Sequence, residues 1–411
     1  MSNINIPLNY RNNYNNYNLF NFNYLNSLPF NYNSNISPNP NNINYNINSE
    51  INITNFNQGY PKNNQGYFKN NKQENNIMIK INKNPCGIIN YKNNCYFNSG
   101  LQILVTCNKF VEELRKYKNI NNELIQLIND AIYKLLNEEI YDPYNFLKYF
   151  CILNNESYIS QYCSQSFIRK IIMNINNELI KIGDINYINE NNQYIQNIRS
   201  AKQKQIELKK FINYIESNKY FPECKVMKLF SGISKYYSYG ICTKCKENIE
   251  EYSFSYFLDQ NIYLDNMPKS CSFSNLLFDN LGSKSKITII CPKCKNEANL
   301  TEETKLINLP EILIFTLERY KEGFNDILVI PDEFIDITNY LDDSIKLINT
   351  KYEYELFAIN IRFGQSIDSG HEICQVKRNG IWYEINDTSA YKRNKTYNNN
   401  SYGLFYQRKY K

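Results

Sequence analysis

The stretch GIINYKNNCYFNSGLQIL, residues 87–104, separates an Asn-rich N-terminal region from sequence with regular apolar spacing. Cys95 stands where this spacing begins, directly after Asn93 and Asn94, which are favourable N-cap residues. The apolar residues that follow at helical intervals are Phe97, Leu101, Leu104, Val105 and Phe110. The pattern predicts that Cys95 lies in the first turn of a helix, where unpaired backbone N–H groups and the helix dipole favour a thiolate.

The composition indicates a chain that folds without disulfides. Its 411 residues are 42% apolar and include twelve cysteines, yet the N-terminus lacks the basic and apolar segments of a secretory signal peptide. No apolar run approaches the roughly 18 residues that span a bilayer. The formal net charge of +6 is spread along the chain and forms no basic stripe. We therefore expect a cytoplasmic or nuclear monomer that binds neither membranes nor nucleic acid.

The chain is expected to consist of a disordered region and a folded domain. Residues 1–80 are rich in Asn and show no lasting helical or strand period, so they have no common face to bury. Residues 85–411 are predicted to fold, and a polar stretch at 183–220, which contains a surface helix, is interpreted as an insertion into this domain.

The folded domain is predicted to belong to the α+β class, with helices first and an antiparallel sheet after them. Besides the pattern that follows Cys95, residues 130–150 and 165–182 each show the apolar spacing of an amphipathic helix. Short β-like runs separated by turn residues come later in the chain. They are KITIIC, EILIFTL, DILVI, YELFAINIRF, HEICQV, IWYEI and GLFYQRK.

Two Cys-x-x-Cys pairs predict a metal site. Cys242 and Cys245 form the first pair, and Cys291 and Cys294 form the second. Each pair can hold one ion from a tight turn, and two pairs complete a tetrahedral thiolate site of the kind that binds zinc. Four protein ligands leave no open position for a substrate, so this zinc is expected to be structural. The alternative is a pair of unrelated surface turns.

His371 is the only histidine of the chain, so any chemistry that pairs a thiol with an imidazole must use it. A lone histidine is otherwise more often a surface or core residue. The sequence HEICQVKRNGIWYEIND alternates on both sides of Asn379-Gly380, the preferred dipeptide of a two-residue type I′ hairpin turn. Such a turn puts His371 diagonally across from Asn386 on one face of the ribbon. Asp387 falls on the opposite face.

These residues match the Cys-His-Asn variant of the acyl-transfer triad. An imidazole can form an ion pair with the thiolate of Cys95, and Asn386 can hold the ring. The side chain of Asn90 can donate to an oxyanion together with the backbone N–H of Cys95. The alternative is that Cys95 is an inert buried thiol, like Cys107 further along the chain.

The motifs resemble those of the ubiquitin-specific protease family of cysteine deubiquitinases, in the family's own order. GIINYKNNCYFNSGLQ follows the family's Cys box G-L-x-N-x-G-N-T-C-Y-x-N-S-x-L-Q. LFSGISKYYSYGICTKC is similar to the entry into the family's fingers, and LPEILIFTLERY and YGLFYQRK are similar to later strands. The residues that match the His box are Gly370, His371, Trp382, Asn386 and Asp387.

The resemblance covers residues 85–409 and implies a papain-like cysteine protease with a helical thumb, a β-sheet palm and zinc-bearing β fingers at about 224–300. It implies that Cys95 is the nucleophile, that His371 is the general base and that Asn386 orients His371. It also implies that Asn90 donates to the oxyanion. Asp387 is implied to assist at the oxyanion or to stand in for Asn386. The implied cofactor is a structural Zn²⁺ held by Cys242, Cys245, Cys291 and Cys294.

The sequence departs from the family pattern at several positions near this site. Beside the motifs, the chain has Lys92 for a Gly, Asn94 for a Thr, Glu372 for an aromatic residue and Arg362 for a common His. The segment QYCSQSFIRK carries Cys163 and Ser166 where the family has two acids that meet the arginines of the ubiquitin tail. The identity of the modifier is therefore left open between ubiquitin and a ubiquitin-like protein.

The sequence thus favours a thiol-dependent isopeptidase that cleaves after the C-terminal Gly of such a modifier, through a thioester with Cys95. Two alternatives belong to other classes. The first is a catalytically weak or inactive ubiquitin-binding scaffold, which the missing acids and Lys92 favour. The second is a zinc-ribbon protein that binds nucleic acid, which the scattered basic residues disfavour.

Overall fold

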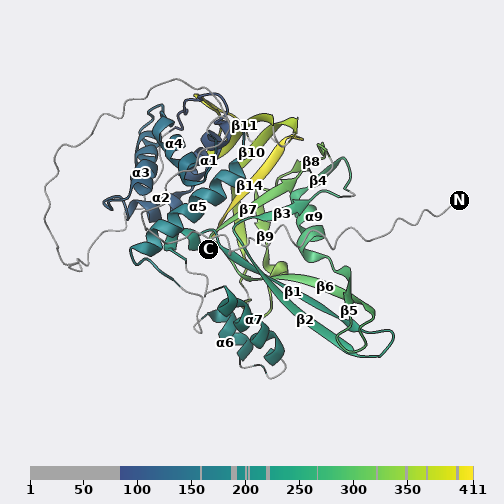
Figure 1. Cartoon of the computed structure of the whole chain (residues 1–411). Coiled ribbons are helices and arrows are strands. Elements are labelled where there is room, and N and C mark those ends of the chain that lie inside the picture. Colours follow the sequence, from purple (N-terminus) through teal and green to yellow (C-terminus); the bar gives the residue numbers. More distant parts are fainter. Residues whose placement is uncertain are drawn as a thin grey trace, which may run out of the picture. The chain divides into compact units, whose positions relative to one another are not determined.

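The computed structural model describes residues 84–410 apart from 158–159, 187–191, 200, 202–203, 219–222, 266, 321–322, 348–349, 367–368 and 395–397. The region predicted to be disordered, residues 1–80, lies outside the described residues. The described part is a mixed α+β structure, as the sequence predicts (Figure 1). Among the described residues, no helix is both long and apolar enough to span a bilayer.

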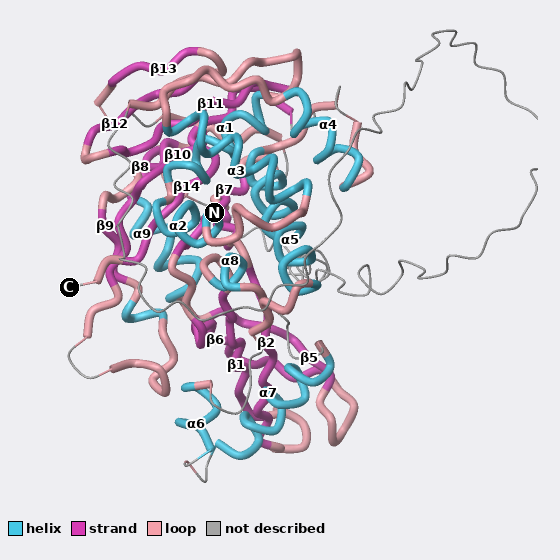
Figure 2. The backbone as a smooth tube through the Cα atoms, turned by 90° about the vertical axis from the view of Figure 1, so that its left-hand side faces the viewer, coloured by secondary structure: helices cyan, strands magenta, loops and turns pink. Residues whose placement is uncertain are grey.

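A group of helices forms the thumb of the molecule, on one side of the large sheet (Figure 1). They are α1 (Cys95–Thr106), α2 (Asn108–Arg115), α3 (Glu123–Leu136), α4 (Tyr144–Leu153), α5 (Ser164–Lys181) and the short α8 (Lys225–Lys228). Figure 2 shows α3, α4 and α5 on one side of α1 and the strands β12 and β13 on the other. Helix α1, which begins at Cys95, therefore lies between the other thumb helices and the sheet.

Two predicted helices are each divided in the structure. The helical spacing that runs from Cys95 to Phe110 is broken at Cys107, whose ψ of 99° is extended, so Phe110 belongs to α2. The predicted helix over residues 130–150 is broken before Pro143, which precedes the first residue of α4. Proline lacks a backbone N–H and disfavours helical conformation in the residue before it.

Aromatic packing fixes α1 against the other thumb helices. All twelve residues of α1 are buried. The ring of Phe97 lies with its centroid 5.0 Å from that of Phe146 and 4.6 Å from that of Phe167 on α5. Gly100 permits this approach, because a Cβ atom there would lie 2.4 Å from the Phe167 ring. Burial of such side chains is the main stabilising contribution to the thumb.

The palm is a sheet whose strands run in the order β13-β12-β11-β10-β14-β7-β3, with β9 paired to β10. Its pairs are antiparallel except for β3 with β7, which is parallel. Its strands are β3 (Gln260–Tyr263), β7 (Ile312–Glu318), β9 (Phe334–Asp336), β10 (Glu353–Ser366), β11 (Ser369–Arg378), β12 (Ile381–Asn386), β13 (Ser389–Lys392) and β14 (Ser401–Arg408). Helix α1 packs against β11 and β10, so Cys95 is carried on the face of the palm.

Short elements complete the palm. The run DILVI, predicted as a strand of the antiparallel sheet, instead contributes β8 (Leu328–Ile330), which pairs in parallel with β4 (Ser270–Ser272). Three residues are too few to fix a pairing partner by pattern alone. The remaining elements are α9 (Phe273–Leu277), the π-helical turn η4 (Phe278–Gly282) and the 3₁₀ turn η5 (Thr338–Tyr340).

A second sheet forms the fingers and extends away from the palm (Figure 1). Its strands are β1 (Gly232–Ile241), β2 (Asn248–Phe257), β5 (Ser285–Ile290) and β6 (Glu297–Asn308), in the order β2-β1-β6-β5. The turn between β1 and β2 and the turn between β5 and β6 each contain one of the Cys-x-x-Cys pairs. The antiparallel pairing of these strands therefore brings the two pairs to the same end of the sheet.

The polar stretch at 183–220 contributes α6 (Gln193–Arg199) and α7 (Gln205–Ser217), which pack together beside the fingers. Phe211 of α7 lies with its ring centroid 4.8 Å from that of Phe254 on β2. Glu207 of α7 forms a buried ion pair with Lys235 of β1, at 2.8 Å. Apolar contacts and a buried charge pair thus join α7 to the fingers.

Candidate active site

Cys95 is the first residue of α1 and is buried, with 2% of its surface exposed. Asn94 is the N-cap residue, but its side chain makes no cap hydrogen bond. Its Oδ1 accepts from the backbone N–H of Tyr91 at 2.6 Å, and its Nδ2 donates to the Asn98 Oδ1 at 2.9 Å. The cap residue therefore gives the first N–H groups of α1 no side-chain acceptor. N–H groups in this position can donate to an anion at the start of the helix.

The loop before the thiol is held in an unusual backbone conformation. Lys92 has a φ of 110°, a region that glycine adopts readily and other residues rarely do. The family pattern has a glycine at this position. The side-chain Oδ1 of Asn90 accepts from the backbone N–H of Lys92 at 2.9 Å, which supports the turn.

The hairpin that carries His371 has the predicted register. Cys374 lies opposite Ile385 in the pairing of β11 with β12. Asn379 and Gly380 have φ values of 50° and 76°, the left-handed values that a type I′ turn requires. A two-residue turn is thus confirmed, and with it the placement of Asn386 on the His371 face.

His371 joins the thiol to the asparagine. Its Nε2 lies 2.8 Å from the Oδ1 of Asn386. A hydrogen bond to Cys95 and a second one to Asn386, opposed by partial burial, raise the pKa of His371 to about 9. An imidazolium that persists at neutral pH is the partner that a thiolate needs.

Asp387 lies beside the triad but has different partners. Its carboxylate accepts from Asn90 Nδ2 at 2.7 Å and from Asn98 Nδ2 at 2.8 Å. Its backbone oxygen accepts from the N–H of Ile88 at 2.8 Å. Asp387 therefore holds the loop that precedes Cys95, whereas Asn386 contacts the imidazole. One N–H of the Asn90 amide is used in this contact, which fixes the direction of the other.

Gln161 is a site residue that the sequence reasoning did not single out. Its Nε2 lies 3.9 Å from the Cys95 Sγ and donates to the carbonyl oxygen of Gly370, and its Oε1 accepts from the Gly370 N–H at 2.9 Å. It thus touches both Cys95 and the residue before His371. Its position in the segment QYCSQSFIRK, which resembles a family motif, was the available signal.

The residues that replace the two family acids have structural partners. Cys163 is the N-cap residue of α5, and its Sγ accepts from the backbone N–H of Ser166 at 3.4 Å. Neither side chain can offer a carboxylate to a basic tail. Nearby Arg169 pairs with Asp259 at 3.1 Å, so this acid already has a cationic partner.

The four cysteines of the two Cys-x-x-Cys pairs converge at the end of the fingers. Their Sγ atoms all lie within 4.8 Å of one another. Cys242 and Cys294 are 3.6 Å apart at sulfur, as are Cys245 and Cys291. This arrangement could hold one metal ion with four thiolate ligands, and it lies at the tip of a sheet, outside the triad.

The two turns that carry the Cys-x-x-Cys pairs have the same backbone geometry. Lys246 and Lys295, which follow the second cysteine of each pair, have φ values of 62° and 57°. The N–H of each donates to the carbonyl oxygen of the first cysteine of its pair, at 3.0 Å in both turns. This equivalence argues against two unrelated surface turns.

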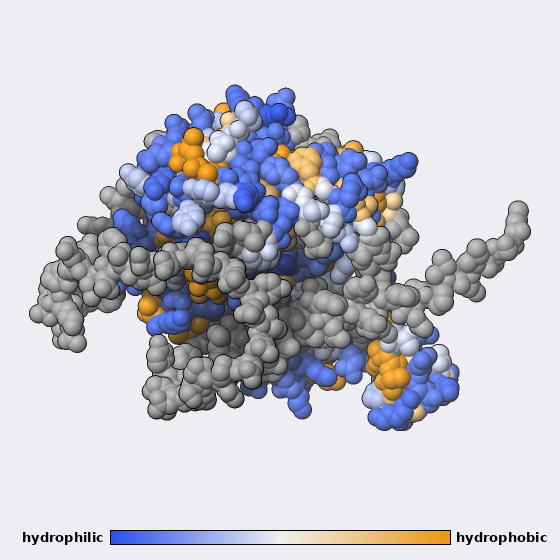
Figure 3. Space-filling view, turned by 45° about the horizontal axis from the view of Figure 1, so that its top comes forward, coloured by the Kyte–Doolittle hydropathy of each residue, from blue (hydrophilic) through white to orange (hydrophobic). Residues whose placement is uncertain are grey.

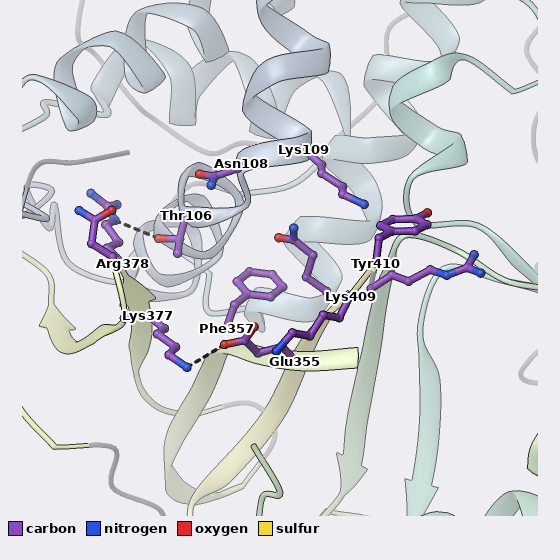
Figure 4. Close-up of a pocket in the computed structure, with 13 residues that line it drawn as sticks. Thr106, Asn108, Lys109, Glu355, Phe357, Lys377, Arg378, Lys409 and Tyr410 are labelled. Carbon is purple, nitrogen blue, oxygen red and sulfur yellow. Dashed lines mark hydrogen bonds and ion pairs between the residues drawn. The ribbon is translucent and has the colours of Figure 1, made fainter. Parts of the chain in front are cut away.

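A separate basic hollow lies at the other end of β11 from His371 (Figure 4). It measures about 500 Å³ and contains none of the triad residues. Its cationic lining residues are Lys109, Lys377, Arg378, Arg408 and Lys409. Carboxylates neutralise part of this charge, since Lys377 pairs with Glu355 at 2.8 Å and Lys109 pairs with Glu311. Among the described residues that are visible in Figure 3, most of the surface is hydrophilic and the apolar side chains form separate groups.

A helical thumb, a β-sheet palm and cysteine-bearing fingers, with a thiol and an imidazole between thumb and palm, define the papain-like class of cysteine hydrolase folds. The sequence model of the family described as ubiquitin carboxyl-terminal hydrolase matches residues 86–406. The chain therefore belongs to the ubiquitin carboxyl-terminal hydrolase family.

Individual relatives match shorter segments of the chain. It is 30% identical to ubiquitin carboxyl-terminal hydrolase 17-like protein B of Mus musculus over 122 residues. This aligned segment is 28% of this chain and 25% of that protein. It is 28% identical over 177 residues to ubiquitin carboxyl-terminal hydrolase 48 of Gallus gallus, which covers 41% of this chain and 16% of that protein. The chain thus spans only a minor part of the length of these relatives.

Solved structures share the fold. The SAGA Ubp8/Sgf11/Sus1/Sgf73 DUB module bound to ubiquitin aldehyde matches 81% of this chain and 71% of that chain, with a TM-score of 0.58 and 17% identity. A SAGA DUB module bound to monoubiquitin matches the same shares of the two chains with a TM-score of 0.56, also at 17% identity. The predicted thumb, palm and fingers are confirmed by this likeness.

Proposed function

We propose that this chain is a thiol-dependent deubiquitinase that hydrolyses the bond after the C-terminal Gly of ubiquitin or a ubiquitin-like modifier. The observation that carries the proposal is the position of His371, which hydrogen-bonds Cys95 on one side and Asn386 on the other. Membership of the ubiquitin carboxyl-terminal hydrolase family supports the substrate class. The solved neighbour bound to ubiquitin aldehyde supports it at the level of fold.

The proposed chemistry uses Cys95 as the nucleophile and His371 as the acid and base. The thiolate of Cys95 attacks the carbonyl carbon of the terminal Gly and forms a C–S bond. The C–N bond breaks as the imidazolium of His371 gives its proton to the leaving lysine amine. A water molecule then attacks the thioester carbonyl carbon and gives one proton to His371. The C–S bond breaks, the modifier leaves with a carboxyl group whose remaining proton passes to solvent, and Cys95 and His371 return to the thiolate and imidazolium. Asn386 keeps the ring oriented through both steps.

The oxyanion of each tetrahedral intermediate has donors within the same loop. Cys95 is the first residue of α1, so its backbone N–H is one of the groups that receive no hydrogen bond within the helix and can donate to an oxyanion. Asn90 supplies a side-chain N–H, and Asp387 fixes its amide. Donors that are already oriented stabilise developing charge without reorganisation, which typically contributes about 10²- to 10³-fold in turnover.

The four cysteines of the fingers are proposed to hold one Zn²⁺. Soft thiolate ligands in a tetrahedral set suit zinc, and a closed four-ligand site gives the metal a structural role. When bound, the ion would link the β1–β2 turn to the β5–β6 turn. The chain's own residues at the triad then carry the hydrolysis.

Labelling with an electrophilic probe tests this proposal. A ubiquitin with a C-terminal vinyl methyl ester should add covalently to Cys95, and intact-mass analysis should show one adduct per chain. Cys95→Ala should abolish the adduct, whereas Cys107→Ala, a buried thiol further along the thumb, should retain it. A panel of ubiquitin-like probes identifies the preferred modifier.

The inactive scaffold gives a different outcome. A scaffold would bind ubiquitin reversibly without an adduct, which a titration with unmodified ubiquitin detects. Absence of labelling by ubiquitin and by every ubiquitin-like probe, from a protein that is folded, would refute the enzymatic proposal. Labelling of a cysteine other than Cys95 would refute the assignment of the nucleophile.

A further inference from the structure

Glu372, the residue after His371, is a fully buried carboxylate, with 1% of its surface exposed. Its Oε1 accepts from Arg362 Nη1. Its Oε2 accepts from the backbone N–H of Ser164 at 2.9 Å, from the Ser164 hydroxyl, and from Asn360 Nδ2 at 3.2 Å. A buried charge is costly unless paired and hydrogen-bonded, and here both oxygens have donors. The carboxylate is therefore fixed in one orientation.

The donors to Glu372 come from both the thumb and the palm. Arg362 and Asn360 lie on β10 of the palm, next to β11, whereas Ser164 is the first residue of α5 in the thumb. The Ser164 Oγ also lies 3.0 Å from the carbonyl oxygen of Tyr96, the residue after the nucleophile. Its single proton is shared between these two acceptors. Glu372 thus ties β11 to α5, and α5 in turn to the start of α1.

A second link lies on the other side of His371. Gln161 binds the backbone of Gly370 through both atoms of its amide. Arg362, the partner of Glu372, also donates to the carbonyl oxygen of Tyr162, at 3.1 Å. The thumb segment at 161–164 is therefore attached to β11 at the residues directly before and directly after His371.

We propose that Glu372 is a positioning residue that sets the contact between His371 and Cys95 before any substrate binds. The inference rests on the proposed function, because it assigns a role at the same site. His371 is carried by the palm and Cys95 by the thumb, so their contact depends on how these parts are joined. A displacement of about 1 Å at such a contact can cost about 10²-fold in rate.

The charge pair has a direct consequence for substitution. Glu372→Gln keeps the shape of the side chain but removes the charge that Arg362 and the Ser164 N–H require. The cationic guanidinium then remains buried with a weaker acceptor, and the thumb segment at 161–164 loses one of its two attachments to β11. We expect the alkylation rate of Cys95 to fall by about tenfold or more at neutral pH, because the imidazole would no longer be held beside the thiol.

Glu207 provides a matched control. It is also a buried carboxylate, 2% exposed, paired with the buried Lys235 at 2.8 Å, but it lies between α7 and the fingers. Glu207→Gln makes the same chemical change in another buried ion pair, where Lys235 keeps Asp342 as a second carboxylate partner. It should lower the melting temperature by less than Glu372→Gln does and leave the reactivity of Cys95 unchanged.

The measurement is the second-order rate of Cys95 alkylation by iodoacetamide as a function of pH, followed by peptide mapping, with no modifier present. All variants are compared at a temperature where circular dichroism shows them folded. A lower rate and an altered pH profile in Glu372→Gln but not in Glu207→Gln supports the proposal. Equal rates in the two variants would overturn it.

Ser164→Ala is a milder variant that keeps the Arg362–Glu372 pair. It removes the hydroxyl shared with Tyr96, and we expect alkylation to slow several-fold. If Glu372→Gln does not fold, this variant decides, and a rate equal to that of the natural chain counts against the proposal. The alkylation assay needs no modifier, so the two proposals can fail separately. If the ubiquitin probe labels Cys95 but the alkylation rate does not depend on Glu372, only the positioning role is refuted. If the alkylation rate depends on Glu372 but no probe labels Cys95, only the deubiquitinase proposal is refuted.

Discussion

Replacing Asp387 with Asn tests whether this carboxylate acts through Asn90. The natural carboxylate accepts from Asn90 at 2.7 Å and from Asn98 at 2.8 Å. Asp387→Asn keeps the volume but converts one acceptor oxygen into an NH₂ group, so one of the two amides faces a donor. Hydrogen bonds to charged groups contribute about 1.5–3 kcal/mol each, so we expect the free energy of unfolding to fall by about 2 kcal/mol.

The effect on turnover should be larger than the effect on substrate binding. If Asn90 donates to the oxyanion, losing its orientation should lower kcat by about 10²-fold, close to the effect of Asn90→Ala, and leave KM nearly unchanged. The double variant Asn90→Ala/Asp387→Asn should then lose no more than Asn90→Ala alone, because both changes remove one interaction.

The assay is steady-state hydrolysis of a fluorogenic ubiquitin C-terminal amide, with urea unfolding measured on the same samples. Asp336→Asn is the control, since that carboxylate also accepts two hydrogen bonds, both from Thr338, at a distance from the site. Losses that multiply in the double variant would show that Asp387 and Asn90 act independently. Unchanged turnover in Asp387→Asn would show that Asn90 does not depend on Asp387, and unchanged turnover in Asn90→Ala would remove the oxyanion role from Asn90.

Three further outcomes are expected. The activity should fall above about pH 9, where His371 loses its proton. Asn386→Ala should shift this alkaline decrease in activity to lower pH, because it removes a hydrogen bond that raises the pKa of His371. A pH profile of kcat for the natural chain and the variant checks both. Purified protein should contain one zinc per chain by elemental analysis. Chelation should lower the stability of the fingers, because the binding energy of a four-thiolate site contributes to folding. A metal-free protein of unchanged stability would contradict the assignment of the zinc site. Lys92→Gly should raise the free energy of unfolding by about 1 kcal/mol in denaturant titrations, because glycine adopts the φ of 110° without strain. A loss of stability would show that the Lys92 side chain stabilises the fold by more than its strained backbone destabilises it.

Local sequence patterns were sufficient for the parts of the site that depend on short-range geometry. The Asn379-Gly380 turn determines the register of β11 with β12, so the contact of His371 with Asn386 could be predicted from turn chemistry and the two-residue period of strands. The helical spacing after Cys95 likewise placed the thiol at the start of α1. The two Cys-x-x-Cys pairs indicated a metal site for the same reason, since each turn is local.

The tertiary structure decided the contacts between segments that are distant in the chain. Asp387 holds Asn90, Glu372 joins Ser164 to Arg362, and these partners lie on different elements with no shared period. Side-chain direction across a cleft depends on how the thumb packs on the palm, and no local pattern contains that information. The sequence alone therefore determined the chemical groups of the site, and packing determined which of them hold the others in place.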